Sequence, residues 1–406
     1  MEEWKKYKLG EITSKIGSGA TPKGGRDSYL GGNIALIRSQ NVLDFSFSKL
    51  GLAYINEVQA EKLSNVEVYE KDVLLNITGD SVARVCIVPN NVLPARVNQH
   101  VAIIRGNDKV DYRYLLYYLQ YIKPQLLSLS QGGATRNALT KKMIEELEVK
   151  MPSKGIQKEI VSILYALDSK IELNRRINDN LEQQAQALFK SWFVDFEPFR
   201  GGEFVDSELG LIPKGWRVVS LGEVTKQITE KVGNREDVTV LSPINSGELV
   251  LSEEYFTKQV FSKDLSKYLI VNPLSFAYNP ARINIGSIGL NTFDFVGCVS
   301  PVYVVFECEP NYQYFFDFFK RTAMFKDEVA LRAIGGVRQS LGYNDLSLIK
   351  IIYPTSDVVV EFNNLYLKMK EVMIKNTDQN EKFISLRDSL LPKLMSGELK
   401  INEFNC

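Results

Sequence analysis

The chain contains very little histidine and cysteine for its length. Its 406 residues include a single histidine, His100, and four cysteines, at positions 86, 298, 308 and 406, with no CxxC pair among them. A transition-metal site needs a cluster of such side chains, and a disulfide framework needs regularly spaced cysteines. The sequence therefore predicts no metal site, and its cysteine usage is typical of a reducing, cytoplasmic environment.

Long apolar runs and an excess of one charge are also missing. The longest apolar stretch, near residues 112–121, carries Arg113, and the start of the chain does not resemble a signal peptide, so we expect a cytoplasmic protein with no membrane contact. Lys and Arg number 49, as do Asp and Glu. Zero net charge argues weakly against nucleic-acid binding by a uniformly basic surface, so any DNA binding is expected to use local basic loops.

Signatures of catalysis are missing as well. The Gly-rich loop at residues 17–26 is not a P-loop, because Lys23 is not followed by Ser or Thr. The segment Asn279-Pro280-Ala281-Arg282 matches an adenine-methyltransferase signature only at Asn-Pro, since Arg282 replaces the aromatic residue that would clamp the base. Residue types alone leave a metal-dependent nuclease open, but no acidic cluster with a nearby lysine repeats along the chain. The sequence predicts a non-catalytic protein that holds no cofactor of its own.

What the chain does contain is an internal repeat. Residues 132–152 match residues 335–354 at an offset of 202 from Arg136/Arg338 onward, and residues 9–13 match 221–225 at an offset of 212. A long amphipathic segment follows each copy. Two copies of a globular unit plus a helix predict a protein that presents two similar surfaces at a fixed separation.

Each globular unit is predicted to be mixed α/β. Short β-branched runs bounded by Gly, Asn or Pro predict strands, and helical spacing of apolar residues predicts one helix near the end of each unit. The predicted strands are 34–38, 72–77, 84–88, 100–105 and 146–151, then 238–241, 275–278, 302–307 and 348–353; the predicted helices are 111–129 and 312–332. The domain boundaries that we expect are 1–152, a helix at 153–194, a linker at 195–215, a domain at 216–354, a helix at 355–397 and a tail at 398–406.

The two long helices carry matching heptad patterns. With Ile160 and Phe362 at position a, each apolar seam is interrupted at its midpoint by two asparagines, Asn174 and Asn178 in the first helix and Asn376 and Asn380 in the second. The order of the units along the chain favours antiparallel pairing, with Asn174 facing Asn380 and Asn178 facing Asn376. Only Arg387 then falls within the apolar seam. The alternative left open is that each helix packs only on its own domain.

Loops of both copies carry side chains that read nucleic acids. Bases and phosphates are contacted mainly by Arg, Lys, Asn and Gln, and glycine permits a close backbone approach. Any single residue of this kind is more often part of a solvated turn, so the hypothesis concerns the set. The candidate DNA-binding residues are Lys23, Arg26, Arg38, Gln40, Asn41, Asn76, Thr78, Arg96, Asn98, Arg136, Asn137, Asn279, Arg282, Asn284, Arg338 and Gln339.

Several segments together resemble the specificity (S) subunits of Type I restriction–modification systems, and the likeness covers essentially the whole chain. They are the opening at 4–12, the Gly-Ala-Thr-Pro loop at 19–22, and the segments 72–79, 167–174, 184–193, 210–216 and 390–399. The resemblance implies an α/β (mixed α+β) fold in which two similar target recognition domains are joined by two long antiparallel coiled-coil helices with pseudo-twofold symmetry.

The resemblance also implies a function and partners. Such a subunit is not an enzyme; it recognises double-stranded DNA through a bipartite target, one half-site per domain, and docks methyltransferase subunits, two of them, with restriction/translocase subunits joining for cleavage. S-adenosylmethionine is then bound by the methyltransferase, and ATP and magnesium by the motor. The alternatives are a coiled-coil adaptor that does not read DNA, or the S subunit of a related fused restriction system. Because the recognition loops diverge between the copies, we expect an asymmetric target.

Overall fold

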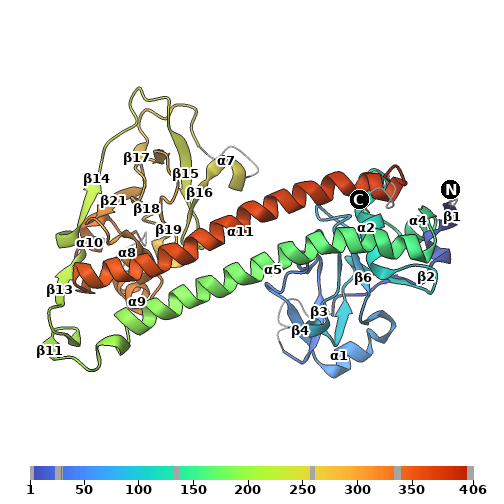
Figure 1. Cartoon of the computed structure of the whole chain (residues 1–406), viewed down its shortest axis with the longest axis horizontal. Helices are drawn as coiled ribbons and strands as arrows, with labels where there is room; N and C mark the ends of the chain where they lie inside the picture. The colour runs from blue at the N-terminus through green and yellow to red at the C-terminus, as the bar shows by residue number, and fades with distance from the viewer. Residues whose placement is uncertain are drawn as a thin grey trace, which may run out of the picture. The chain divides into compact units, whose positions relative to one another are not determined.

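The computed structural model describes residues 4–22, 29, 31–131, 137–256, 261–332 and 340–399. Its contacts divide the chain into two compact units. Unit 1 combines the chain up to Arg176 with the segment from Asn376 onward, and unit 2 runs from Ile177 to Lys375. Each unit therefore contains one globular part and one half of each long helix (Figure 1).

Unit 1 is built on two four-stranded sheets. One has the strand order β2-β9-β6-β7 and is antiparallel throughout; the other has the order β4-β3-β8-β5, in which β3 and β8 run parallel. A separate antiparallel pair joins β1 to β10. The strands are β1 (Lys5–Lys8), β2 (Thr13–Ser18), β3 (Ile34–Ile37), β4 (Ala53–Ile55), β5 (Glu67–Val68), β6 (Val73–Asn76), β7 (Val85–Ile87), β8 (Ala95–Val97), β9 (Val101–Gly106) and β10 (Glu148–Met151).

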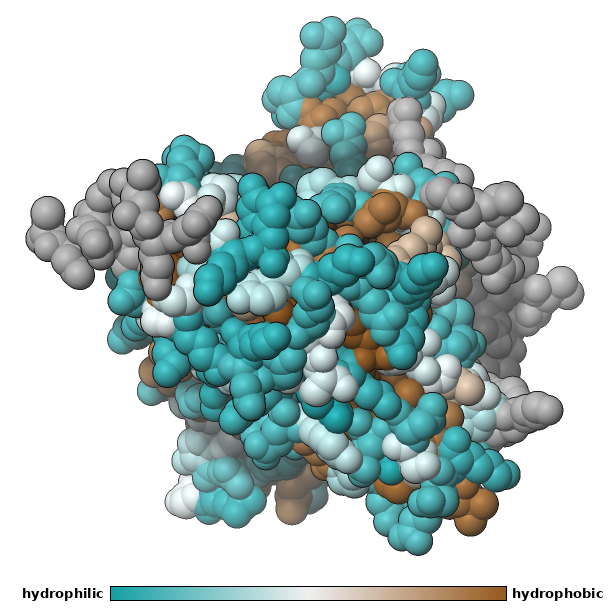
Figure 2. Space-filling view, turned by 90° about the vertical axis from the view of Figure 1, so that its right-hand side faces the viewer, coloured by the Kyte–Doolittle hydropathy of each residue, from teal (hydrophilic) through white to brown (hydrophobic). Residues whose placement is uncertain are grey.

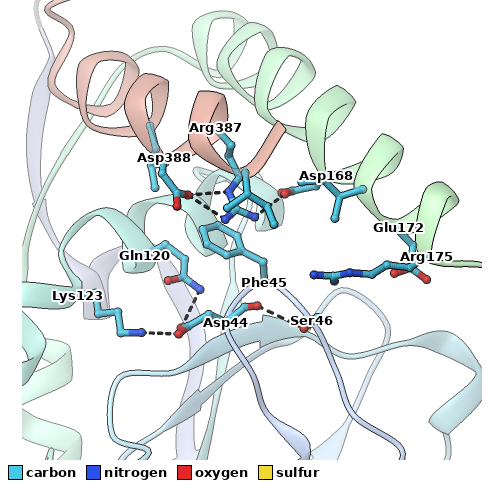
Figure 3. A pocket seen from close by; sticks show the side chains of 13 residues that line it. Asp44, Phe45, Ser46, Gln120, Lys123, Asp168, Glu172, Arg175, Arg387 and Asp388 are labelled. Atoms are coloured by element: carbon cyan, nitrogen blue, oxygen red, sulfur yellow. Dashed lines mark hydrogen bonds and ion pairs between the residues drawn. The ribbon is translucent and has the colours of Figure 1, made fainter. Parts of the chain in front are cut away.

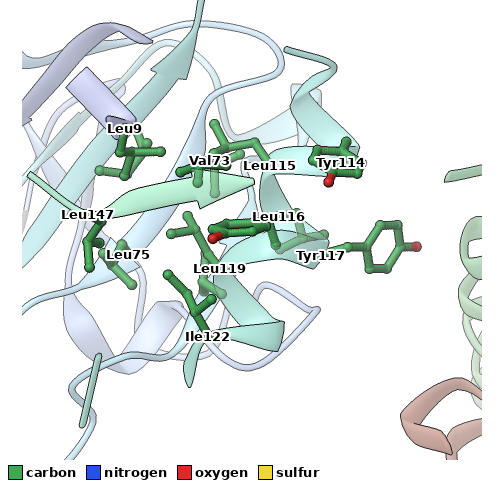
Figure 4. Close-up of a cluster of buried hydrophobic side chains, with 14 of the residues drawn as sticks. Leu9, Val73, Leu75, Tyr114, Leu115, Leu116, Tyr117, Leu119, Ile122 and Leu147 are labelled. Atoms are coloured by element: carbon green, nitrogen blue, oxygen red, sulfur yellow. The ribbon is translucent and has the colours of Figure 1, made fainter. Parts of the chain in front are cut away.

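The core of unit 1 lies between the first sheet and a helical layer. The helices are α1 (Glu57–Glu61), α2 (Tyr112–Tyr121), α3 (Lys123–Ser130) and α4 (Lys141–Glu145). Leu115 and Leu119 of α2 pack with Val73 and Leu75 of β6, as Figure 4 shows, and all four are buried. Burying such aliphatic side chains contributes about 1.5–3 kcal/mol each, and a second buried cluster around β3 and β8 adds to the stability of the unit.

Unit 2 repeats this arrangement of sheets. Its four-stranded sheets have the orders β14-β21-β18-β19 and β16-β15-β20-β17, again with one parallel pair, β15 with β20. Its two-stranded pairs are β13 with β22 and β11 with β12. The strands are β11 (Phe204–Ser207), β12 (Gly210–Pro213), β13 (Arg217–Ser220), β14 (Thr225–Ile228), β15 (Thr239–Pro243), β16 (Leu249–Leu251), β17 (Leu269–Val271), β18 (Phe276–Tyr278), β19 (Ile288–Leu290), β20 (Gly297–Val299), β21 (Val304–Cys308) and β22 (Lys350–Tyr353).

The core of unit 2 is aromatic where that of unit 1 is aliphatic. Its short helices are α6 (Leu221–Val224), α7 (Ser252–Tyr255), α8 (Gln313–Phe319), α9 (Ala323–Arg332) and α10 (Tyr343–Ser347). Phe276 and Phe306 stack in the sheet with ring centroids 5.2 Å apart, and Phe316 of α8 meets Phe276 edge-on at 4.9 Å. Two similar sets of sheets, and the mixed α/β class, are thus confirmed.

Two predicted helices are each divided in two. The helix predicted at 111–129 is interrupted at Ile122, whose backbone leaves the helical region (φ −85°, ψ 10°). Pro124 lies in the first turn of α3, where its missing N–H costs no hydrogen bond. In the helix predicted at 312–332, the Thr322 hydroxyl accepts a hydrogen bond from the N–H of Phe325 and starts α9 as a new helix. The predicted linker at 195–215 contains the β11–β12 hairpin.

The two long helices are α5 (Lys154–Phe193) and α11 (Ser356–Ser396). At 40 and 41 residues they agree with the predicted bounds, and each spans about 60 Å. In unit 1, Ile160 and Leu164 of α5 share one core with Leu391 and Leu394 of α11. The first part of one helix thus packs on the last part of the other, which is antiparallel pairing.

Unit 2 shows the same antiparallel order. Trp192 near the end of α5 contacts Phe362 near the start of α11, with ring centroids 6.4 Å apart. At the midpoint, in unit 1, the Asn174 amide donates to Oδ1 of Asn380 at 3.0 Å, which confirms that predicted pair. Within unit 2, the Asn178 amide donates to the Met373 carbonyl at 3.0 Å. Its pairing with Asn376 stays a prediction. Since a slip of register would leave buried amides unpaired, the Asn174–Asn380 pair fixes the register.

Candidate nucleic-acid interface

In unit 1, the loop that follows β6 is hydrogen-bonded to the loop that contains Asn137. The Gly79 N–H donates to the Asn137 carbonyl at 3.1 Å, and the Leu139 N–H donates to the Ile77 carbonyl at 2.8 Å. These bonds bring the predicted residues Thr78 and Asn137 onto one surface. Asn137 is exposed and Thr78 is half-buried.

Unit 2 joins the equivalent loops in the same way. The Leu341 N–H donates to the Pro280 carbonyl at 3.0 Å, and Leu341 lies 202 residues after Leu139. The loop after β18 is further shaped by Asn279, whose Oδ1 accepts the Ala281 N–H at 3.0 Å. This turn leaves the predicted residues Arg282 and Asn284 exposed. Both copies therefore bring the same two loops together.

A chain of polar side chains that our residue list omitted lies beside Thr78. Oγ1 of Thr78 is 2.5 Å from Nδ1 of His100, and Nε2 of His100 is 3.1 Å from the amide nitrogen of Gln99. The Gln99 amide oxygen in turn accepts from the Thr21 hydroxyl at 2.5 Å. Gln99 is exposed, so this chain presents donors and acceptors at the surface. Its members lie in three separate segments, so only the tertiary structure brings them together.

Four predicted contact residues are instead buried and hold the loops in place. Asn41 is fully buried: its Oδ1 accepts from the Arg38 N–H at 3.0 Å, and its amide donates to the Ser48 carbonyl at 2.9 Å. The Asn76 amide, also fully buried, donates to the Ser39 carbonyl at 2.9 Å. Oδ1 of Asn98 accepts the His100 N–H at 3.0 Å. Oδ1 of Asn76 has no hydrogen-bond partner among the described residues, but the NH2 groups of Asn41 and Asn76 are bound to backbone carbonyls and hold the loops in place.

Arg96 is the fourth of these residues. Only 7% of it is exposed; Nε donates to the Ala60 carbonyl at 3.2 Å, and Nη1 donates to the Ala95 carbonyl and to Glu67. It therefore joins β8 to α1 and β5. Two predicted residues nearby remain accessible: Gln40 is exposed, and half-buried Arg38 donates to the Gly51 carbonyl at 2.5 Å.

Replacing Arg96 with alanine is expected to lower stability and leave sequence preference unchanged. The change removes the hydrogen bonds to the Ala60 and Ala95 carbonyls and to Glu67 inside the domain, and should lower the free energy of unfolding by about 1–3 kcal/mol. Urea unfolding measures the first effect, and competition binding with mixed duplexes measures the second. Gln99→Ala, at the exposed surface, serves as the converse control. A change of preferred sequence in Arg96→Ala at full stability would contradict this assignment.

A buried lysine fixes the equivalent surface in unit 2. The Lys320 ammonium pairs with Asp317 at 2.9 Å and donates to the carbonyls of Gly247 and Ile288, the latter at 2.9 Å. Burial lowers the pKa of Lys320, and the neighbouring Asp317 carboxylate opposes that shift. Lys320 thus ties the turn before β16 to the start of β19, beside the loop that presents Arg282.

Five predicted residues, Lys23, Arg26, Arg136, Arg338 and Gln339, lie outside the described residues. Hydrophilic side chains cover most of the face drawn in Figure 2, and apolar ones are scattered in separate small areas. Among the described residues, no group of three or more His, Cys, Asp or Glu side chains is placed to hold a metal ion. Nor is any described helix long and apolar enough to cross a membrane.

Comparison with known proteins agrees with this architecture. Residues 1–183 match the model of the Type I restriction modification DNA specificity domain. The relatives that this chain resembles over its length are Type I restriction specificity subunits. The MjaIX specificity subunit of Methanocaldococcus jannaschii is 26% identical over 416 residues, which cover 99% of this chain and 95% of that protein. The HindI specificity subunit of Haemophilus influenzae is 24% identical, with 98% and 100% covered.

A solved specificity subunit shares the fold. The crystal structure of the Type I restriction–modification S subunit from M. genitalium superposes with a TM-score of 0.53 at 14% identity, covering 97% of this chain and 96% of that one. At that identity the likeness concerns the fold alone. Two sets of sheets and two long helices are thus common to both proteins.

Proposed function

We propose that this specificity subunit recognises a bipartite, asymmetric target in double-stranded DNA, one half-site with each globular domain, residues 1–152 and 216–354. The observation that carries the proposal is that both copies join the same two loops by equivalent backbone hydrogen bonds, Leu139 to Ile77 and Leu341 to Pro280. On the loops after β6 and β18, which occupy the same position in their sheets, the exposed side chains differ between the copies: Asp80 in unit 1, and Arg282 with Asn284 in unit 2. Similar frames with different contact residues support an asymmetric target.

The chain itself is proposed to be non-catalytic and to act within a complex. Methyltransferase subunits, two of them, would dock on the long helices and the segments beside them, and restriction/translocase subunits would join for cleavage. S-adenosylmethionine would then be bound by the methyltransferase, and ATP and magnesium by the motor. Exposed apolar side chains on both helices support docking, among them Leu173 and Ile177 of α5 and Leu365 and Val372 of α11.

Arg282→Ala tests whether each globular domain recognises its own half-site independently of the other. The arginine is exposed on the loop after β18, and losing a guanidinium that contacts a base edge costs about 1–3 kcal/mol, or roughly 5- to 150-fold in affinity. We expect the affinity loss to vanish when the second half-site is scrambled and to persist when the first half-site is scrambled. Titration of labelled duplexes with a mapped target provides the measurement.

The matched control is Arg217→Ala, which removes an exposed arginine from the β13–β22 pair of the same unit. It should bind like the wild type. Equal losses at both half-sites in Arg282→Ala would count against modular reading. If the wild-type chain, with its methyltransferase, prefers no duplex sequence at physiological salt, the adaptor function replaces this proposal.

A further inference from the structure

An arginine occupies a position of the helical seam where the heptad pattern calls for an apolar residue. Arg387 of α11 falls at a d position, between Asn380 and Leu394, and only 7% of it is exposed. Its guanidinium group donates to Oδ1 of Asp168 on α5 at 2.9 Å and to Oδ1 of Asp388 at 2.8 Å. One buried cation therefore joins the two long helices within unit 1.

The same guanidinium also contacts the recognition domain. It stacks on the ring of Phe45 at 3.7 Å from the ring centroid, and Figure 3 shows Phe45 pointing from its turn toward Arg387. Asp168 accepts a second hydrogen bond, 2.6 Å from the hydroxyl of Tyr117 on α2. Residues of both helices and of the globular domain thus meet at Arg387.

The turn that carries Phe45 is held rigidly by the recognition domain. Phe45 has a left-handed backbone (φ 59°), an uncommon conformation for a bulky residue, and its N–H donates to the Val85 carbonyl at 3.0 Å. Asp44 next to it accepts from Lys123 at 2.5 Å and from Gln120 at 3.2 Å. A displacement of Phe45 would therefore move the domain as a body.

Hydrogen bonds connect this turn to the candidate DNA-contacting loops. The buried Asn76 amide donates to the carbonyls of Ser39 and Val42, at 2.9 and 3.3 Å. Asn76 ends β6 and precedes the loop of Thr78, whereas Ser39 and Val42 lie between Arg38 and the turn of Phe45. The contact of Phe45 with Arg387 and the candidate contact residues Arg38 and Thr78 therefore belong to one connected structure.

Beside this cluster the packing between turn and helices is open. A pocket of about 430 Å³ lies there, lined by the Asp44–Ser46 turn, by Glu172 and Arg175 of α5, and by Ile384 of α11 (Figure 3). Phe45 and Arg387 both line this pocket, so their contact joins the turn to α11 at its edge. Replacing a buried ion pair with apolar residues is often neutral or stabilising, so overall stability gives little reason for a cation at this position. A planar guanidinium that must satisfy two carboxylates and a ring permits only one arrangement of the three elements.

We propose that Arg387 is a positioning residue that sets the orientation of the first recognition domain on the two long helices, and through it the separation of half-sites that the protein accepts. The inference rests on the proposed function, since it concerns the same bipartite target. In this proposal, the separation of the half-sites depends on the contact between Arg387 and Phe45 as well as on the length of the helices.

The test measures spacing selectivity. The full-length chain, co-purified with a co-expressed partner methyltransferase, is titrated with duplexes that carry both half-sites at the natural separation and at separations one base pair shorter and longer. The ratio of affinities for natural and altered separations is compared between the wild type and Arg387→Met. We expect the variant to lower this ratio about tenfold, the effect of losing about 1.4 kcal/mol of orientational preference. A merely structural role would reduce the active fraction and leave the ratio unchanged.

Two further variants complete the experiment. Phe45→Leu removes the stacked ring and keeps the ion pairs, so it should lower the ratio in the same direction and decides the matter if Arg387→Met does not fold. Arg175→Met removes an exposed arginine from the same pocket and should leave the ratio at its wild-type value. Ratios within twofold of the wild type in both Arg387→Met and Phe45→Leu would overturn the inference, as would a wild type that binds its target regardless of spacing. A wild type with no sequence preference would instead overturn the proposed function.

Discussion

Above about pH 10 the protein is expected to lose several kcal/mol of its free energy of unfolding. Burial, as the largest cause, raises the pKa of nine tyrosines, most strongly of six, and that of Tyr118 rises to about 12. Hydrogen bonds to carboxylates add to the shift where the Tyr117 hydroxyl donates to Asp168 and that of Tyr353 donates to Glu309. The six are Tyr114, Tyr117 and Tyr118 in unit 1 and Tyr278, Tyr353 and Tyr366 in unit 2.

The direction in which the free energy of unfolding changes with pH depends on which state, folded or unfolded, binds more protons. An unfolded tyrosine loses its proton near pH 10, whereas the folded one keeps it until its raised pKa is reached. Between these values the folded state binds more protons, so the stabilising contribution is complete below pH 10 and is lost at about 1.4 kcal/mol per pH unit for each tyrosine. Lys320 acts in the opposite sense: because its pKa is lowered, its contribution to stability rises with pH up to the unfolded value near 10.5. Lys370, whose pKa is also lowered by burial, acts in the same sense as Lys320, and two lysines cannot offset six tyrosines.

Urea unfolding followed by circular dichroism between pH 8 and pH 11 measures this loss. Tyr118→Phe is the matched variant. It keeps the ring and removes the hydroxyl that donates to the Glu148 carbonyl at 2.8 Å, so its stability should fall less steeply above pH 10. A free energy of unfolding that stays constant from pH 9 to pH 11 would show that these hydroxyls are not protected by burial.

Replacing Phe189 with alanine is expected to destabilise unit 2 by about 3–5 kcal/mol, the cost of deleting a buried aromatic ring and leaving a cavity. Phe189 of α5 is 3% exposed, and its ring centroid lies 4.9 Å from that of Phe193, 5.5 Å from Phe318 and 5.8 Å from Phe362. It thereby joins α5 to α8 and α11. A loss of this size is a large fraction of the stability of a domain.

Thermal and urea unfolding of the full chain provide the measurement, with Leu173→Ala as control. Leu173 lies on the same helix and is 46% exposed, so its removal should change stability by less than about 0.5 kcal/mol. Because the two units have separate cores, we expect unit 2 to unfold first in Phe189→Ala and the transition to become biphasic. A single transition at the wild-type midpoint would be incompatible with a central role for this ring.

The strands predicted correctly include those with runs of buried aliphatic residues, such as Val73–Asn76 and Val101–Gly106. The strands that were missed are mostly of two or three residues, such as Glu67–Val68 and Ala95–Val97. Such segments are too short to show an alternation, and they form because a neighbouring strand is already in place. In the same way, helix 111–129 was predicted as continuous because its apolar spacing persists across Ile122, while the break depends on local backbone geometry and on Pro124.

The candidate contact residues were predicted by type, and residue type does not distinguish an asparagine that faces DNA from one that fixes a loop. Asparagine is a residue type that contacts bases in DNA. Asn41 and Asn76, however, are fully buried, which is typical of residues that stabilise the fold. Conversely, Thr21, Gln99 and His100 form one polar chain with Thr78, but their segments lie far apart in the sequence.

The sequence by itself determined the duplication, the mixed α/β class, the bounds of the two long helices and the Asn174–Asn380 register. Each of these features can be inferred from the local spacing of apolar residues or from the offset between the repeats, because neither depends on contacts between distant parts of the chain. Only the tertiary structure decided which polar side chains reach the surface, and that Arg387 is held by Asp168 and Phe45. The physical reason is that burial and ion pairing depend on elements that the fold brings together from distant parts of the chain.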